Sequence, residues 1–199
     1  QFDDNNVMVN DVIHLLTKEE PNPITMLDLL KLSLRLHPTV LVPAEMRGKE
    51  ALTVQEAGRT GHTIVSTLHA NSARAAYDRI LTMCLEAGTS LSEERLLKNI
   101  VEAFPIMLFK MQLPDKSRKY MEIFEATGVK DGEVTGNTLF KFVVDHYEKD
   151  EAGRITKVVG SHQRMENISP ALAERLLVNG VELTEIRRFA GNGYRPEGG

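Results

Sequence analysis

Two short apolar runs, separated by a helix-forming segment, constrain the fold of this chain more than any other feature of its sequence. Residues 39–42 (TVLV) and 63–68 (TIVSTL) are rich in β-branched side chains and contain no charge. Such runs are typical of strands that are buried on both faces of a parallel sheet. Helical segments precede, separate and follow them. A helix–strand–helix–strand–helix order predicts an α/β layered fold with parallel strands.

The helices of this layer are predicted from their start and stop signals. We expect four of them, over about residues 25–37, 49–59, 72–87 and 90–104, with Pro38, Gly61 and Gly88 ending the first three. A side-chain oxygen at the first position of a helix accepts a backbone N–H that has no partner within the helix. The expected capping residues are Thr25 with Asp28, Asn71 or Ser72, and Ser90 with Glu93.

The pattern changes after residue 105, where strands follow one another without intervening helices. A Pro114-Asp115 turn and a charged DEAG turn at 150–153 predict two antiparallel hairpins. Ser169 followed by Pro170 then predicts a last helical region, and we expect the tail after residue 191 to be disordered. We assign residues 1–128 to an α/β core and residues 129–199 to an accessory segment. The expected strands are 106–113, 119–125, 139–144 and 155–159.

The composition is that of an ordinary folded protein, and the charge disfavours one class of partner. Apolar residues make up 42% and charged residues 26% of its 199 residues, and no apolar run approaches the length of a membrane span. The net charge of −4, without a basic cluster, disfavours binding to nucleic acid. One cysteine, Cys84, fits a reducing compartment and is expected to be a buried helix residue. The chain begins with Gln1 rather than Met, which favours a piece of a longer protein.

Glu45 is the sharpest candidate for chemistry, because it follows the first predicted strand almost directly. Ligands of open α/β sheets bind at the carboxyl edge of the strands, where a glutamate can polarise an attacking water. The alternative is a helix-capping glutamate or one that is paired with Arg47, and the sequence does not separate the two. His69 occupies the matching place after the second strand, so we expect Glu45 and His69 to lie at the same edge.

His62 lies at the other end of that second strand, about 20 Å from His69 if the strand is extended. A metal site that combines His62, His69 and Glu45 is therefore not expected, and the spacing matches no common zinc pattern. The sequence also contains no phosphate-binding loop. Gly48-Lys49 does not qualify, because Glu50 replaces the required Ser or Thr and Pro43 stands in place of the first glycine.

Two segments resemble a known family of motor ATPases. VLVPAEMRGKEA (40–51) resembles the Walker B segment of the type II/type IV secretion ATPase superfamily, and GRTGHTIVSTLHANSA (58–73) resembles its histidine box. The segment LSLRLHP before the first strand and the run at 100–128 are also similar to that family. The nearest resemblance is to the ATPases of tight-adherence pili and conjugation systems.

The resemblance implies the C-terminal part of a RecA-like domain, an incomplete three-layer core with an antiparallel β extension and C-terminal helices. It implies a cytoplasmic hexamer that uses ATP and Mg²⁺ and works on an inner-membrane platform protein to drive protein export or pilus assembly. Glu45 would be the catalytic base, His69 would contact the γ-phosphate or the water, and Arg47, His62 and Arg79 would be supporting residues of the nucleotide site or of the subunit interface. Without a phosphate loop, this chain is expected neither to bind the nucleotide nor to hydrolyse it alone. The alternative is a non-catalytic module that docks onto an intact motor.

Overall fold

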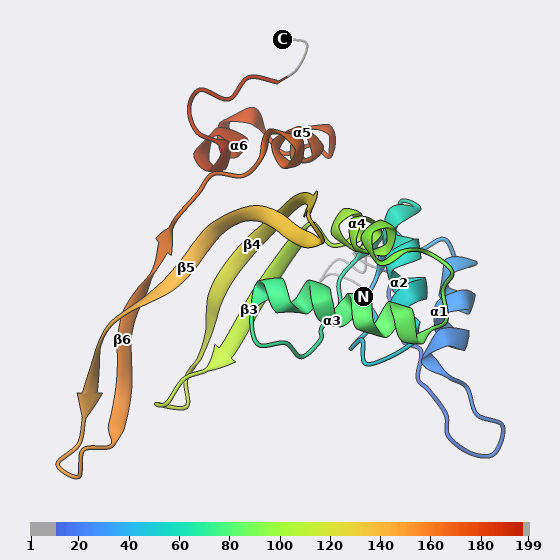
Figure 1. Cartoon of the computed structure of the whole chain (residues 1–199), viewed down its shortest axis with the longest axis horizontal. Helices are drawn as coiled ribbons and strands as arrows, with labels where there is room; N and C mark the ends of the chain where they lie inside the picture. The colour runs from blue at the N-terminus through green and yellow to red at the C-terminus, as the bar shows by residue number, and fades with distance from the viewer. Residues whose placement is uncertain (1–10, 197–199) are drawn as a thin grey trace, which may run out of the picture.

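The computed structural model describes residues 11–196, which form six helices and six strands (Figure 1). Helices α1 to α4 gather beside the antiparallel sheet, with α3 running across its flank, and α5 and α6 form a separate pair at the C-terminal end. The elements are α1 (Met26–Leu34), β1 (Val40–Leu41), α2 (Glu50–Arg59), β2 (Thr63–Ile64), α3 (Ala73–Glu86), α4 (Glu93–Ala103), β3 (Ile106–Gln112), β4 (Arg118–Lys130), β5 (Glu133–Lys149), β6 (Ile155–Arg164), α5 (Pro170–Val178) and α6 (Leu183–Ala190).

The predicted α/β class is confirmed, with strands β1 and β2 parallel and β3 to β6 in one antiparallel sheet. In the parallel pair, Val40 lies opposite Thr63 and Leu41 lies opposite Ile64. Both strands are shorter than the sequence predicts. The backbone bond from Val65 N to Leu41 O, 3.1 Å long, continues the pairing for one more residue.

The prediction that both strands are buried on both faces is wrong for this chain. Leu41 faces the core, whereas Val40, Val42 and Val65 are 49%, 64% and 55% exposed. Val40 and Val42 share a face because side chains two residues apart in a strand point the same way, and Val65 is next in register to Val42. Helices cover one face of the pair only. We call the exposed side, formed by Val40, Val42 and Val65, the uncovered face.

One hydrophobic core joins the helices to both sheets. Leu41 from β1 belongs to the same buried cluster as Phe124 and Ala126 from β4, and the helices fill the space between them. Gly58 of α2 allows close packing against α4, since a Cβ at this position would lie 3.0 Å from the Cβ of Ala103. The helices contribute Leu30, Val54, Tyr77, Ile80, Met83, Cys84, Leu96, Leu97 and Ile100, and the loop after β1 contributes Met46.

Helix caps follow the predicted chemistry, with one correction. The capping box of Thr25 and Asp28 is present at α1, and the Ser72 hydroxyl accepts the backbone N–H of Ala75 at the start of α3. At α4, however, the cap is Ser92 and not Ser90, because the Ser92 hydroxyl accepts the N–H of Arg95 and Glu93 already lies in the helix. The helix begins two residues later than the spacing of Ser90 and Glu93 indicates.

The antiparallel sheet extends far beyond the predicted strands. Strand β5 has 17 residues and β4 has 13, joined by a two-residue turn in which Asp131 and Gly132 both have positive φ. Beyond Lys141, the structure pairs β5 with β6 only, which gives a long ribbon that leads away from the helices (Figure 1). A second small cluster, built around Leu113, Phe142 and Val158, holds the β3–β4 turn against this ribbon.

The C-terminal helix pair is attached to the sheet through a buried carboxylate. Glu125 of β4 is 2% exposed, and it accepts hydrogen bonds from both the backbone N–H and the hydroxyl of Ser169. The same hydroxyl caps α5 by accepting the N–H of Leu172. The segment 191–194 falls in the predicted disordered tail. Here the Tyr194 hydroxyl contacts Glu174 on α5 at 3.0 Å. In the described part of the chain, no helix is long and apolar enough to cross a membrane.

Candidate functional site at the strand ends

Glu45 and His69 come together beyond the carboxyl ends of β1 and β2. The His69 Nε2 atom lies 3.4 Å from Glu45 Oε1, and the two residues differ sharply in accessibility. The His69 side chain is 88% exposed, whereas that of Glu45 is only 23% exposed. Glu45 Oε1 is itself buried and makes no hydrogen bond within the described residues. The expected meeting of these two side chains at one sheet edge is therefore present.

Arg47 holds the second oxygen of the same carboxylate. Its guanidinium donates to Glu45 Oε2 at 2.6 Å, and this hydrogen bond is the main reason that the pKa of Glu45 lies below its usual value. Partial burial raises this pKa, while the charges of Arg47, His69 and Arg79 lower it further. Glu45 is thus ionised at neutral pH. The ion pair with Arg47, one of the two interpretations left open by the sequence, exists beside the contact with His69.

The loop after Glu45 is shaped by Glu50, which the sequence analysis did not select as a site residue. A Glu50 carboxylate oxygen accepts the backbone N–H groups of Arg47 and Gly48 at 2.6 and 3.0 Å. Glu50 therefore holds the loop that leads into α2, whose N-cap residue Lys49 makes no side-chain capping bond, and Glu45 does not cap this helix either. This turn directs the Arg47 side chain back toward Glu45.

Arg79 approaches the site from α3. With Arg47 it lines a hollow of about 250 Å³, and its charge acts on Glu45. Asp78, Thr82 and Glu86 also line this hollow, so it is polar and of mixed charge. The arrangement places two guanidinium groups close to the Glu45 carboxylate, within a hollow that also contains acidic side chains.

His62 lies apart from these residues. It follows α2 directly, where its backbone N–H donates to Ala57 O at 3.3 Å, and it precedes the first residue of β2. Its Nδ1 atom is buried and has no hydrogen-bond partner within residues 11–196. Within residues 11–196, no hydrogen bond or ion pair joins His62 to Glu45.

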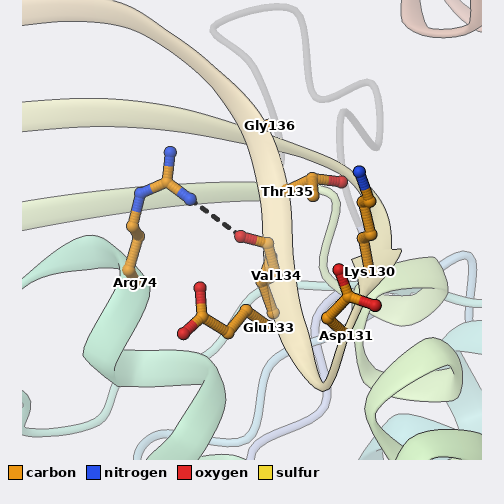
Figure 2. A pocket seen from close by; sticks show the side chains of 7 residues that line it. All are labelled: Arg74, Lys130, Asp131, Glu133, Val134, Thr135 and Gly136. Carbon is orange, nitrogen blue, oxygen red and sulfur yellow. Dashed lines mark hydrogen bonds between the residues drawn. The ribbon is translucent and has the colours of Figure 1, made fainter.

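A larger hollow of about 400 Å³ lies away from the strand ends, beside the β4–β5 turn (Figure 2). Arg74 enters it from α3, and its guanidinium donates to the carbonyl of Val134 at 2.7 Å while lying 4.3 Å from the centre of the Phe124 ring. Lys130, Asp131 and Glu133 from the turn line the rest. Since Arg74 is engaged by the protein itself, this hollow offers no free cation from α3.

The described residues contain no cluster of three or more His, Cys, Asp or Glu side chains that could hold a metal ion. The residues present fit only the terminal-phosphate end of a Mg²⁺–nucleotide ligand. The ionised Glu45 and the two arginines suit the terminal phosphate and a reacting water, whereas the sequence supplies no loop to enclose the other phosphates.

Comparison with known families shows that the strand-end residues lie in a segment that matches one protein family. Residues 3–129 match the sequence profile of the family described as "Type II/IV secretion system protein". This match covers more than half of the chain and includes Glu45, Arg47, His62, His69 and Arg79. The chain belongs to the type II/IV secretion ATPase superfamily. The superfamily match ends at residue 129, so the β5–β6 ribbon and the C-terminal helices lie beyond it.

Curated members of the superfamily match shorter stretches. The competence protein ComGA of Streptococcus pneumoniae is 42% identical over 74 residues, which are 37% of this chain and 22% of that protein. The conjugal transfer protein TrbB of Rhizobium radiobacter is 28% identical over 109 residues, 54% of this chain and 32% of that protein. A crystal structure of the VirB11 ATPase from the Brucella suis type IV secretion system has a TM-score of 0.49 at 24% identity, covering 51% of this chain and 32% of that one.

These matches span between about a fifth and a third of each relative's own length.

Proposed function

We propose that this chain is the C-terminal segment of a secretion or pilus-assembly motor, which couples ATP hydrolysis to protein export or pilus assembly when it is complete. The observation that supports this most is the pairing of Glu45 with His69 at the carboxyl ends of two parallel strands, within a chain of the secretion ATPase superfamily. Ligands of parallel sheets bind at this edge.

In this proposal each strand-end residue has a separate role. Glu45, whose carboxylate lies at the carboxyl ends of the strands beside His69, acts as the general base that orients and deprotonates the attacking water. His69, the more exposed partner, contacts the γ-phosphate or that water. Arg47 and Arg79 offset the negative charge of the phosphates, as guanidinium groups do in phosphoryl transfer. His62 supports the fold or a contact between subunits.

The proposal also assigns a partner to the uncovered face. Parallel strands are usually covered on both faces, and a pair of two-residue strands lacks the area for a stable sheet of its own. We propose that the polypeptide bearing the phosphate loop packs over Val40, Val42 and Val65. The complete protein would then bind ATP and Mg²⁺, assemble as a cytoplasmic hexamer, and act on an inner-membrane platform protein.

A second function follows from the same uncovered face. The chain could serve as a non-catalytic module that docks on an intact motor, with that motor as the partner covering the three valines. Sequencing of the DNA upstream of Gln1 separates the two. A continuous reading frame that encodes G-x-x-x-x-G-K-[ST] supports the motor segment, and a start codon next to Gln1 supports the module.

The catalytic part of the proposal is tested in two proteins. The purified chain of 199 residues should show no steady ATP turnover, because it lacks the loop whose N–H groups and lysine hold the phosphates. In a protein that also contains the phosphate-loop half, Glu45→Gln should still bind ATP but lose hydrolysis by about 100-fold or more, the scale of a lost general base. Glu56→Gln on α2 is the matched control. Equal turnover of Glu45→Gln and parent would show that Glu45 is structural.

A further inference from the structure

The backbone pairing between the two parallel strands is interrupted just before it reaches Glu45. The last regular bond of the pair runs from Val65 N to Leu41 O, and the next backbone bond runs from Met46 N to Thr67 O at 2.8 Å. Between these bonds lies Pro43, which has no N–H to donate. The segment that carries Glu45 therefore begins at Pro43, where the regular backbone hydrogen bonds between the two strands end.

Two side-chain hydroxyls hold this segment in place of the missing backbone bonds. The Ser66 hydroxyl donates to the carbonyl of Pro43 at 2.8 Å, and the Thr67 hydroxyl donates to the carbonyl of Ala44 at 2.7 Å. Consecutive residues of one segment thus bind consecutive carbonyls of the other. Together with the Met46 bond, they fix the backbone on both sides of Glu45 to the residues that directly precede His69.

We infer that Ser66 and Thr67 are positioning residues, whose hydroxyls set the Glu45 carboxylate against His69. The Glu45–His69 contact of 3.4 Å is not a hydrogen bond that could hold itself, and the His69 side chain is almost fully exposed. Arg47 holds the other oxygen of the carboxylate, and the two hydroxyls fix the backbone from which the Glu45 side chain extends. The catalytic consequence of this inference rests on the proposed function, while its geometric content does not.

Two substitutions at Thr67 distinguish the effect of losing the hydroxyl from the effect of changing the shape of the side chain. Thr67→Val keeps the branched shape and removes the donor, which leaves the Ala44 carbonyl without its partner. Thr67→Ser keeps the donor and removes only a methyl group. Ser66→Ala makes the equivalent change at the Pro43 carbonyl, and Thr184→Val, on an exposed position of α6, is a hydroxyl-loss control far from the site.

The first experiment uses NMR on the purified 199-residue chain. In Thr67→Val and Ser66→Ala, the amide of Met46 should exchange with solvent about five-fold faster, as expected for one lost neutral hydrogen bond. The nuclear Overhauser effect between the His69 ring and the Glu45 side chain should weaken. Thr67→Ser and Thr184→Val should match the parent in both measurements. The inference is overturned if Thr67→Val leaves both signals unchanged, or if Thr67→Ser loses them to the same extent.

The second experiment measures ATP turnover in the protein that includes the phosphate-loop half. Thr67→Val should lower kcat with little change in KM for ATP, and Thr67→Ser should restore most of it, because the hydroxyl aligns the base without touching the nucleotide. If Glu45→Gln turns over normally, the proposed function fails while the NMR result stands. If Glu45→Gln is inactive but Thr67→Val has the kcat of the parent, the positioning role fails and the proposed function stands.

Discussion

At the scale of single residues, the ion pair with Arg47 controls the charge of Glu45 and gives a measurable pH dependence. The Arg47 hydrogen bond is the largest cause that lowers the pKa of Glu45, and partial burial acts in the opposite direction. Arg47→Ala should therefore raise the pKa of Glu45, as measured by carbon-detected NMR titration of its carboxyl group. Lys49→Ala removes a nearby charge without removing this bond and is the control. An unchanged pKa in Arg47→Ala would show that the pair does not form in solution.

The sign of the effect on stability follows from the same shift. Because the pKa of Glu45 is lower in the folded chain than in the unfolded chain, the pair stabilises the fold at pH values above the ordinary carboxyl pKa. This contribution is lost as the pH falls through the lowered pKa. Urea unfolding of Arg47→Ala should accordingly show a weaker loss of stability than the parent between about pH 5 and pH 3.

The two histidines should respond differently to substitution, since only His69 lies at the Glu45 edge. In a protein with the phosphate-loop half, His69→Ala should lower kcat with little change in subunit assembly. His62→Ala should act through folding or assembly instead, because His62 follows α2 and its Nδ1 atom is buried. ATPase assays and light scattering separate these outcomes. A loss of kcat in His62→Ala, with normal assembly, would exchange the two roles.

The sequence predicts the meeting of Glu45 and His69 because the carboxyl ends of neighbouring parallel strands share an edge. It does not predict Glu50, Ser66 or Thr67, because their contacts depend on where the loop after Pro43 turns. The signal that the sequence offers for the two hydroxyl residues is their position two and three residues before His69, the second histidine of the histidine box.

At the scale of secondary-structure elements, Ser169 joins two tasks that are usually separate. Its hydroxyl caps α5 and, with its backbone N–H, satisfies the buried Glu125 carboxylate. Ser169→Ala should destabilise the chain by about 2–3 kcal/mol, the sum of a lost cap and of a poorly satisfied buried charge. Ser92→Ala loses only the cap of α4 and should cost about 1 kcal/mol. Urea unfolding measures both, and equal losses would show that the Glu125 contact adds nothing.

Helices were easier to predict than strands, for a physical reason. Their starts depend on local side-chain oxygens, so the caps at Thr25, Ser72 and Ser169 are visible in the sequence. Strand β5 was predicted over 139–144 but runs from Glu133 to Lys149. Most of the added residues are polar and exposed, so the sequence there shows no alternation of apolar residues. Pairing with β4 and β6 nevertheless keeps these residues in the strand.

At the scale of the whole molecule, the sequence correctly predicts an α/β unit followed by antiparallel strands and C-terminal helices. It does not predict how much of the parallel pair is covered. Apolar runs such as 39–42 and 63–68 indicate strands with buried faces, but they do not show which polypeptide covers each face. The exposure of Val40, Val42 and Val65 is consistent with the relatives' greater length.

This uncovered face should make the isolated chain bind apolar probes and associate with itself, because three neighbouring valines form one exposed apolar surface. Val42→Lys places a charge in its centre and should reduce both the fluorescence of a bound naphthalene-sulfonate dye and the apparent mass in light scattering. The melting temperature should change by no more than about 2 °C, since the side chain contributes little to the core. Val178→Lys, at an even more exposed valine on α5, is the control and should leave both readings unchanged. If the two variants behave alike, the valines on β1 and β2 do not form a docking surface, and the polypeptide that carries the phosphate loop must pack elsewhere.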